Sequence, residues 1–165
     1  MSRVFCFFVP GTPVTKGSAR AFVTKAGKAI VMQDNREKQR TWAGVIRTVA
    51  ISHIRHVAKG PCAVRLSFRF GRPKSHWGTG RNAGTLRPSA PRFDLSQKRD
   101  LDKLVRCVLD ALTDVAWLDD GQVVILMAER VWANETHPPG VQIEVTQLFE
   151  EQWEAAATCG RKDGG

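Results

Sequence analysis

Hydrophobic and polar positions along the chain follow two periods, and each period predicts a different kind of element. Residues 63–70 alternate strictly between apolar and polar side chains, as a strand with one buried face does. Residues 4–10, 123–132 and 141–149 are short apolar-rich runs bounded by turn residues, and we expect strands there too. The chain therefore carries enough strand signals for a small sheet.

Two longer segments have the helical period. In residues 100–115, apolar side chains recur at i, i+3, i+4, i+7, i+8 and i+11, which predicts a helix with one buried face. These side chains are Leu101, Leu104, Val105, Val108, Leu109 and Leu112. A less regular stripe predicts a second helix over roughly residues 35–57. It consists of Trp42, Val45, Ile46, Val49 and Ile54.

These elements favour one α+β domain, a small mixed sheet with two main helices on one face. The chain has 165 residues, which suits one domain with its own core. We expect the domain to span residues 1–150 and residues 151–165 to form a flexible tail. The order of the strands does not follow from the pattern.

The net charge is +9 and the isoelectric point about 10, which indicates a polyanionic partner such as nucleic acid. A basic protein without such a partner is the alternative. Much of the charge lies in residues 71–99, called the basic loop below, where seven basic residues face Asp94 alone. A loop this long is either functional or a mobile insertion. A second basic segment contains Lys16, Arg20, Lys25 and Lys28, and it suits phosphate contact and a solvated hairpin equally.

Several function classes find no support in the sequence. The four cysteines are too widely spaced for a zinc knuckle, and the four histidines form no metal pattern. No phosphate-binding loop of the nucleoside-triphosphate type is present, so we expect no nucleotide cofactor. The apolar start, residues 4–9, is too short for a membrane span. We therefore expect a cytoplasmic protein without a membrane partner.

Acidic residues gather at the two ends of the predicted helix 100–115. Asp100 and Asp102 begin it, and Asp119 and Asp120 follow it in a turn. Three structural explanations compete with a functional one. Asp100 can cap the helix, Asp102 can favour its dipole or pair with Arg106 at i+4, and Asp-Asp-Gly is an ordinary turn.

A functional site requires the chain to fold back and bring Asp120 beside the helix start. Carboxylates about 4 Å apart repel by about 4 kcal/mol at an effective dielectric of 20. A hard divalent cation removes this repulsion, and oxygen ligands suit Mg²⁺. A small acidic pocket on a basic surface is a sensible design for a nuclease.

Three motifs, taken in their order along the chain, resemble the RusA family of Holliday-junction resolvases. They are residues 99–104 (RDLDKL), 108–112 (VLDAL) and 117–124 (WLDDGQVV). The family pattern is close to D-L-D-N-L, then D-A-L, then D-D-x-Q-V, and the match extends over about 25 residues. The joint order and spacing make the resemblance specific.

The resemblance implies that Asp100, Asp102 and Asp120 bind the catalytic metal. Asp119 then looks like a helper or a turn residue. Arg106 stands where the family has a functional basic residue, and its guanidinium fork suits the scissile phosphate. Lys103 stands where the pattern often has Asn, and it either weakens metal binding or contacts phosphate.

The same resemblance implies an Mg²⁺-dependent endodeoxyribonuclease, with Mn²⁺ as an expected substitute, that makes paired symmetric nicks in a four-way DNA junction. Two cuts need two sites, so we expect a homodimer. The resemblance also implies a role in DNA recombination and repair. The expected DNA contacts are Lys74, Arg81, Arg87, Arg92, Lys98, Arg99 and Lys103. The alternatives are a non-catalytic protein that binds branched DNA or RNA, and a metal nuclease acting on flaps, forks or single strands.

Overall fold

The computed structural model describes residues 3–16, 19–23, 29–33 and 36–149. Four strands form a mixed sheet in the order β1-β6-β4-β5. Their bounds are Arg3–Pro10 for β1, Cys62–Phe70 for β4, Val123–Trp132 for β5 and Gly140–Gln147 for β6. β6 is antiparallel to both β1 and β4, whereas β5 is parallel to β4. The predicted tail, residues 151–165, lies outside the described residues.

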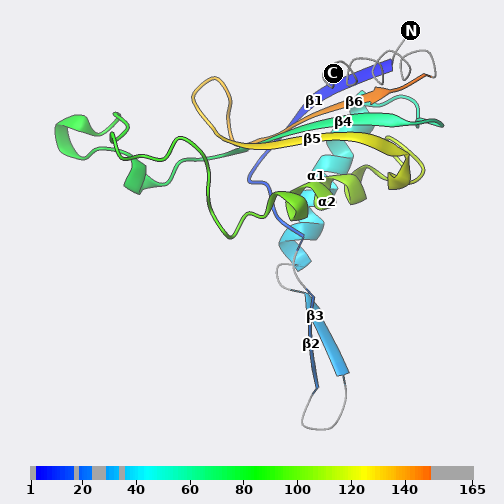
Figure 1. Ribbon diagram of the computed structural model, residues 1–165, viewed down its shortest axis with the longest axis horizontal. Helices are drawn as coiled ribbons and strands as arrows, with labels where there is room; N and C mark the ends of the chain where they lie inside the picture. The colour runs from blue at the N-terminus through cyan, green and yellow to red at the C-terminus, as the bar shows by residue number, and fades with distance from the viewer. Residues whose placement is uncertain (1–2, 17–18, 24–28, 34–35, 150–165) are drawn as a thin grey trace, which may run out of the picture.

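Two helices cover one face of this sheet (Figure 1). They are α1 (Arg36–His53) and α2 (Leu101–Leu112). This arrangement confirms the predicted α+β domain, with a small mixed sheet and its two main helices on one side. No helix in the described part of the chain has the length and apolar character needed to cross a membrane.

The core lies between the sheet and the helices, as the alternation in the sequence predicted. Every second residue of β4 is buried, and Leu66 and Phe68 are fully enclosed. The apolar stripe of α2 is buried at Leu104, Val105, Val108 and Leu112, and Leu109 is partly buried beside them. Replacing one of these leucines with alanine typically costs about 2–5 kcal/mol, because a cavity is left behind.

Both helices end earlier than the sequence pattern suggested. α1 ends at His53 rather than near residue 57, and Ile54 enters the core from the segment that follows. α2 ends at Leu112 rather than near residue 115. The reason is local: the backbone is extended at Thr113, with ψ of 137°, and left-handed at Asp114, with φ of 66°, and an α-helix allows neither. Val45, expected in the apolar stripe of α1, is exposed.

Most of the second basic segment forms a hairpin that projects beyond the helices, away from the four-stranded sheet (Figure 1). Its strands are β2 (Ala19–Val23) and β3 (Ala29–Gln33), which pair with each other in antiparallel register. The hairpin is therefore present, and phosphate contact by this segment stays a prediction. Lys25 and Lys28 lie outside the described residues.

The basic loop leaves the end of β4 and extends beyond the sheet before it returns to α2 (Figure 1). It contains two short 3-10 turns, Lys74–His76 and Gly80–Asn82. Trp77 and Leu86 pair as an antiparallel bridge, so the loop has a small hairpin of its own. The loop therefore has internal backbone structure rather than being one irregular connection.

Candidate active site

A groove of about 490 Å³ lies between α2 and the edge strand β5. Asp102 and Arg106 line it from the helix, and Asp120 lines it from the turn before β5. The rest of the lining is apolar: Leu101, Val105, Leu109, Leu126 and Ala128. The fold thus brings together two carboxylates that the sequence places at opposite ends of the helix.

Helical spacing explains why Asp102 and Arg106 share the groove. They stand at i and i+4, so both side chains lie on the same side of α2. Both are exposed, because the opposite side of the helix carries the buried apolar stripe. Asp102 also stands in the first turn, where an acidic group interacts favourably with the helix dipole.

A tightly bonded turn positions Asp120. The Asp119 carboxylate accepts a hydrogen bond of 2.7 Å from the Gly121 amide, and it begins the 3-10 turn Asp120–Gln122. The Gln122 side chain closes a capping box by accepting the Asp119 amide at 3.1 Å. Asp119 therefore has the contacts of a turn residue, while Asp120 faces the groove.

Gln122 also ties this turn to the rest of the domain. Its Nε2 donates to the carbonyls of Ala58 and Gly60, at 3.1 and 3.0 Å. Sequence reasoning gave Gln122 no role, although it stands in the motif at residues 117–124. The signal was available, because a glutamine at a fixed place beside an acidic turn is well suited to fixing that turn.

Asp100 occupies the N-cap position of α2, but its side chain makes no capping hydrogen bond. Its carboxylate lies 2.6 Å from the ammonium of Lys103 instead. This hydrogen bond and the charge of Asp100, followed by that of Asp102, raise the pKa of Lys103. Asp100 is not among the residues that line the groove.

The donor set suits a hard divalent cation only in part. Among the described residues, no three Asp, Glu, His or Cys side chains are close enough together to hold a metal ion. The groove nevertheless presents two carboxylates, and Mg²⁺ is commonly held by one or two carboxylates together with substrate phosphates and water. The chemistry of Asp102 and Asp120 fits such an ion, whereas Asp100 is engaged with Lys103.

A buried ion pair holds the segment that leads into Asp100. Asp94 is 4% exposed, and its Oδ2 lies 2.7 Å from Nη1 of Arg99. The Asp94 Oδ1 also accepts the Ser96 amide at 3.1 Å. The Arg99 guanidinium lies over the ring of Phe70, 4.4 Å from its centre. Asp94 was noted from the sequence only as the one acidic residue of the basic loop, and its structural role was missed.

Arg130 of β5 fixes the same segment from the other side. Its Nη1 donates to the carbonyls of Ser96 and Arg99. The residues next to Asp100 are therefore bonded both to the basic loop and to the sheet. This places the start of α2 firmly beside β5.

The predicted DNA contacts differ in their surroundings. Lys74, Arg81, Arg92 and Lys98 are exposed along the basic loop. Arg87 is exposed as well, and its Nε donates to the Trp77 carbonyl at 2.8 Å. Arg99 and Lys103 are paired with carboxylates, so part of their charge is neutralised within the protein.

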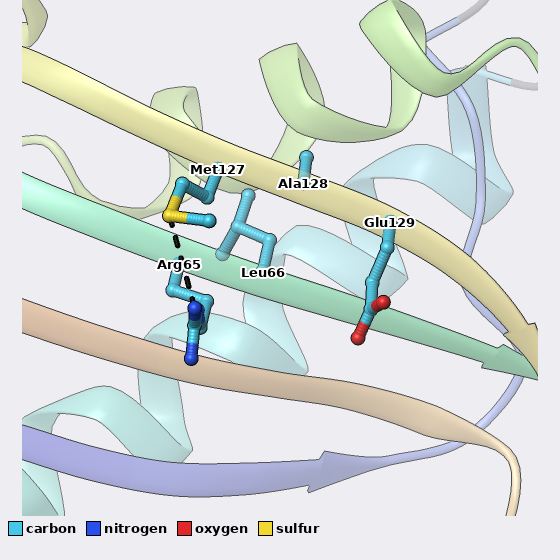
Figure 2. Close-up of a pocket in the computed structure, with 5 residues that line it drawn as sticks. All are labelled: Arg65, Leu66, Met127, Ala128 and Glu129. Carbon is cyan, nitrogen blue, oxygen red and sulfur yellow. Dashed lines mark hydrogen bonds between the residues drawn. The ribbon is translucent and has the colours of Figure 1, made fainter.

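The opposite face of the sheet has a second hollow, shown in Figure 2. Arg65 of β4 and Met127 and Glu129 of β5 stand on it, and Arg65 Nη2 lies 3.8 Å from the sulfur of Met127. None of the predicted site residues lines this hollow. The candidate chemistry is therefore on the helix side of the sheet.

Residues 10–146 match the model of the family described as Endodeoxyribonuclease RusA. The match covers most of the chain, so the protein belongs to this family, as the three motifs had indicated. Membership supports an endodeoxyribonuclease of the Holliday-junction-resolving type, with DNA as its partner. A search of curated proteins found no match.

Proposed function

We propose that this protein is an Mg²⁺-dependent endonuclease that resolves four-way DNA junctions by paired symmetric nicks. The observation that carries the proposal is the groove in which Asp102, Arg106 and Asp120 meet. The basic loop adjoins it and carries a net charge of +6 from seven basic residues and Asp94. An acidic groove beside a basic surface suits a reaction at a phosphodiester.

Asp102 and Asp120 are the proposed ligands of the metal, and Asp100 joins them when its pair with Lys103 opens. The bound ion would activate a water molecule and stabilise negative charge on the phosphate. Mn²⁺ offers the same preference for oxygen ligands and is the proposed substitute. Asp119 supports the site through the turn it caps.

Arg106 is proposed to hold the scissile phosphate. Its guanidinium lines the groove and presents a planar set of donors that matches phosphate oxygens. Its role is to bind and orient the phosphate and to stabilise charge on it.

Two symmetric cuts need two catalytic grooves, which we propose a two-fold homodimer supplies. The basic loops of the two subunits would then hold the arms of the junction through backbone phosphates. The test is the mass in solution with and without junction DNA. A monomeric mass in both conditions contradicts the dimer. An enzyme with this substrate would work in the cytoplasm.

The deciding experiment compares a labelled four-way junction with linear duplex of matched sequence, each with Mg²⁺ and with chelator. Symmetric nicks in the junction alone, abolished by chelator, are the expected result. Asp102→Asn should bind the junction but not cut it. Asp114→Asn is the matched control, because Asp114 is also an exposed carboxylate and asparagine tolerates its left-handed backbone.

Two outcomes contradict the proposal. Tight junction binding without cleavage under Mg²⁺ or Mn²⁺ would leave a non-catalytic junction-binding protein. Preferred cleavage of flaps, forks or single strands would keep the metal site but replace the substrate.

A further inference from the structure

A hollow of about 870 Å³ lies where the basic loop passes the end of β5. Trp77 and Leu86 line it from the hairpin of the basic loop, and Trp132 lines it from the last position of β5. Arg72, Asn134 and Glu135 contribute its polar lining. We call this site the tryptophan hollow. It is separate from the catalytic groove and has no part in the chemistry proposed above.

Backbone hydrogen bonds fix the position of Trp77. Its amide donates to the Lys74 carbonyl at 3.1 Å, and its carbonyl accepts Arg87 Nε at 2.8 Å. On either side of it, the Gly78 amide donates to the Thr85 carbonyl, and the Arg87 amide donates to the His76 carbonyl. The indole of Trp77 is half-buried, so part of its ring remains open to the hollow.

Side-chain hydrogen bonds fix the opposite wall of the hollow, which Trp132 and Arg72 form. Trp132 Nε1 donates to the Pro91 carbonyl at 3.2 Å, and Arg72 Nη1 donates to the same oxygen at 3.0 Å. The Arg72 guanidinium lies over the Trp132 ring, 5.1 Å from its centre. The His76 ring also packs edge-on against the Trp132 ring, with their centres 5.3 Å apart. This wall therefore layers a planar cation on a fixed indole, and an arginine guanidinium can itself stack on a nucleobase.

Charge and polar groups fit the same ligand. The basic loop supplies cations for a phosphate backbone, and Glu135 is the one acidic residue that lines the hollow. The Asn134 Oδ1 accepts Thr136 Oγ1 at 2.9 Å and the His137 amide at 2.8 Å. Its Nδ2 amine is thus directed away from these bonds and can donate to the edge of a base.

We propose that the tryptophan hollow binds an unstacked nucleobase of a DNA strand near the branch point. Aromatic walls on a basic surface are the usual means of holding single-stranded DNA, because every base has a face that stacks. The inference rests on the proposed function. It adds a site for bases of strands that leave the regular duplex. Bases within the duplex stay stacked on each other and do not enter the hollow.

The position along β5 supports this role. Ala128 lines the catalytic groove, and Trp132 lies four residues further along the same strand. At about 3.3 Å per residue, the tryptophan lies roughly 13 Å beyond Ala128. This distance separates the Ala128 side of the groove from the tryptophan and equals about four steps of duplex rise, a length that one DNA strand can span.

Photocrosslinking tests the contact directly. Thymines are replaced one at a time by 5-iodouracil across the branch point of a four-way junction, in a single strand and in linear duplex. We expect crosslinks from the junction and the single strand, but not from the duplex, to the tryptic peptide Ser75–Arg81 or to the peptide that contains Trp132. Crosslinks that map only elsewhere overturn the proposal.

Affinity provides the second test. Trp77→Ala should weaken junction and single-strand binding roughly 5- to 150-fold and leave duplex binding unchanged, because stacking on one base is lost. Trp77→Phe should keep most of the affinity, whereas Trp77→Leu keeps apolar bulk and should lose it. Phe93→Ala is the control, since Phe93 is an exposed aromatic residue of the same loop that does not line the hollow. Equal affinities for wild type, Trp77→Ala and Trp77→Leu overturn the proposal.

The result separates this inference from the proposed function. Normal junction cleavage without crosslinks in the hollow defeats the inference alone. Crosslinks from the single strand that depend on Trp77, without junction cleavage under any divalent ion, defeat the resolvase proposal and retain the base-binding hollow.

Discussion

The ammonium of Lys103 lies 2.6 Å from the carboxylate of Asp100, one turn back along α2. The family pattern often has asparagine at the position of Lys103, and it assigns Asp100 to the metal. In this protein the Lys103 ammonium therefore pairs with Asp100, one of the three acids that the resemblance points to. If Asp100 joins Asp102 and Asp120 on the proposed ion, that ion competes with Lys103 for the Asp100 carboxylate.

Replacing Lys103 with asparagine should make metal binding easier. We expect Lys103→Asn to lower the Mg²⁺ concentration for half-maximal junction cleavage about two- to fivefold, a modest effect because the pair is exposed. Titration of cleavage rate against Mg²⁺ measures it. Lys98→Asn is the control for lost positive charge and should not shift the requirement. A higher Mg²⁺ requirement in Lys103→Asn would contradict the prediction, because Lys103 would then favour metal-dependent cleavage instead of competing with the ion.

Removing the buried carboxylate of Asp94 should destabilise the segment before α2. Asp94→Ala leaves Arg99 without its partner and the Ser96 amide without its acceptor. We expect a loss of about 2–3 kcal/mol in the free energy of unfolding, because hydrogen bonds to a charged group are lost. Urea unfolding measures the change. Asp94→Asn retains one acceptor and should lose less, and equal stability of all three proteins would contradict the prediction.

The exposed cations of the basic loop should bind DNA through phosphate charge. Each phosphate contact contributes about 0.9 to the slope of log affinity against log salt concentration. Arg81→Gln should therefore weaken junction and duplex binding and reduce the slope by about 0.9. Arg55→Gln removes an exposed arginine outside the loop and serves as the control. An unchanged slope in Arg81→Gln would exclude Arg81 from the phosphate contacts.

Stability should fall in alkaline solution because of Cys107. Burial, followed by the charge of Asp110, raises the pKa of this thiol from 9.0 to about 11. The unfolded chain then loses the proton first, so the stabilising contribution is complete below pH 9 and disappears between pH 9 and 11. The full effect is at most roughly 3 kcal/mol.

The measurement is urea unfolding of wild type and Cys107→Ala across this pH range. The pKa of the Cys62 thiol is also raised by burial, but Cys62 is present in both proteins and its effect cancels in the difference. The stability difference between the two proteins should shrink as the pH rises. A constant difference would contradict the role of Cys107.

Local pattern predicted the elements well, and long-range pairing explains what it could not predict. The strand at residues 63–70 and helix α2 have apolar periods that leave little choice of structure. The position of β6 between β1 and β4 depends on contacts between distant segments, so the apolar period within each segment could not predict it. The early end of α2 was missed for a different reason. The left-handed backbone at Asp114 is set by the turn into Val115 and Trp117, which are buried.

The candidate site shows the same division. Spacing alone left Asp102 open to a dipole or ion-pair explanation, and the three motifs supplied the functional interpretation. The pair of Asp100 with Lys103 is local and could have been anticipated, since the two stand at i and i+3. The tryptophan hollow could not, because Trp77 and Trp132 meet only through the path of the basic loop.

The place of β6 in the sheet has a consequence for folding. Among the strands of the described residues it is the last in the sequence, yet it lies between β1 and β4, and β1 pairs with no other of these strands. The N-terminal strand must therefore wait for residues 140–147 before its backbone groups find partners. Such distant pairing slows folding and leaves β1 exposed on a growing chain. During synthesis, the helices and β4 can form early, whereas closure of the sheet is a late step that needs nearly the whole domain.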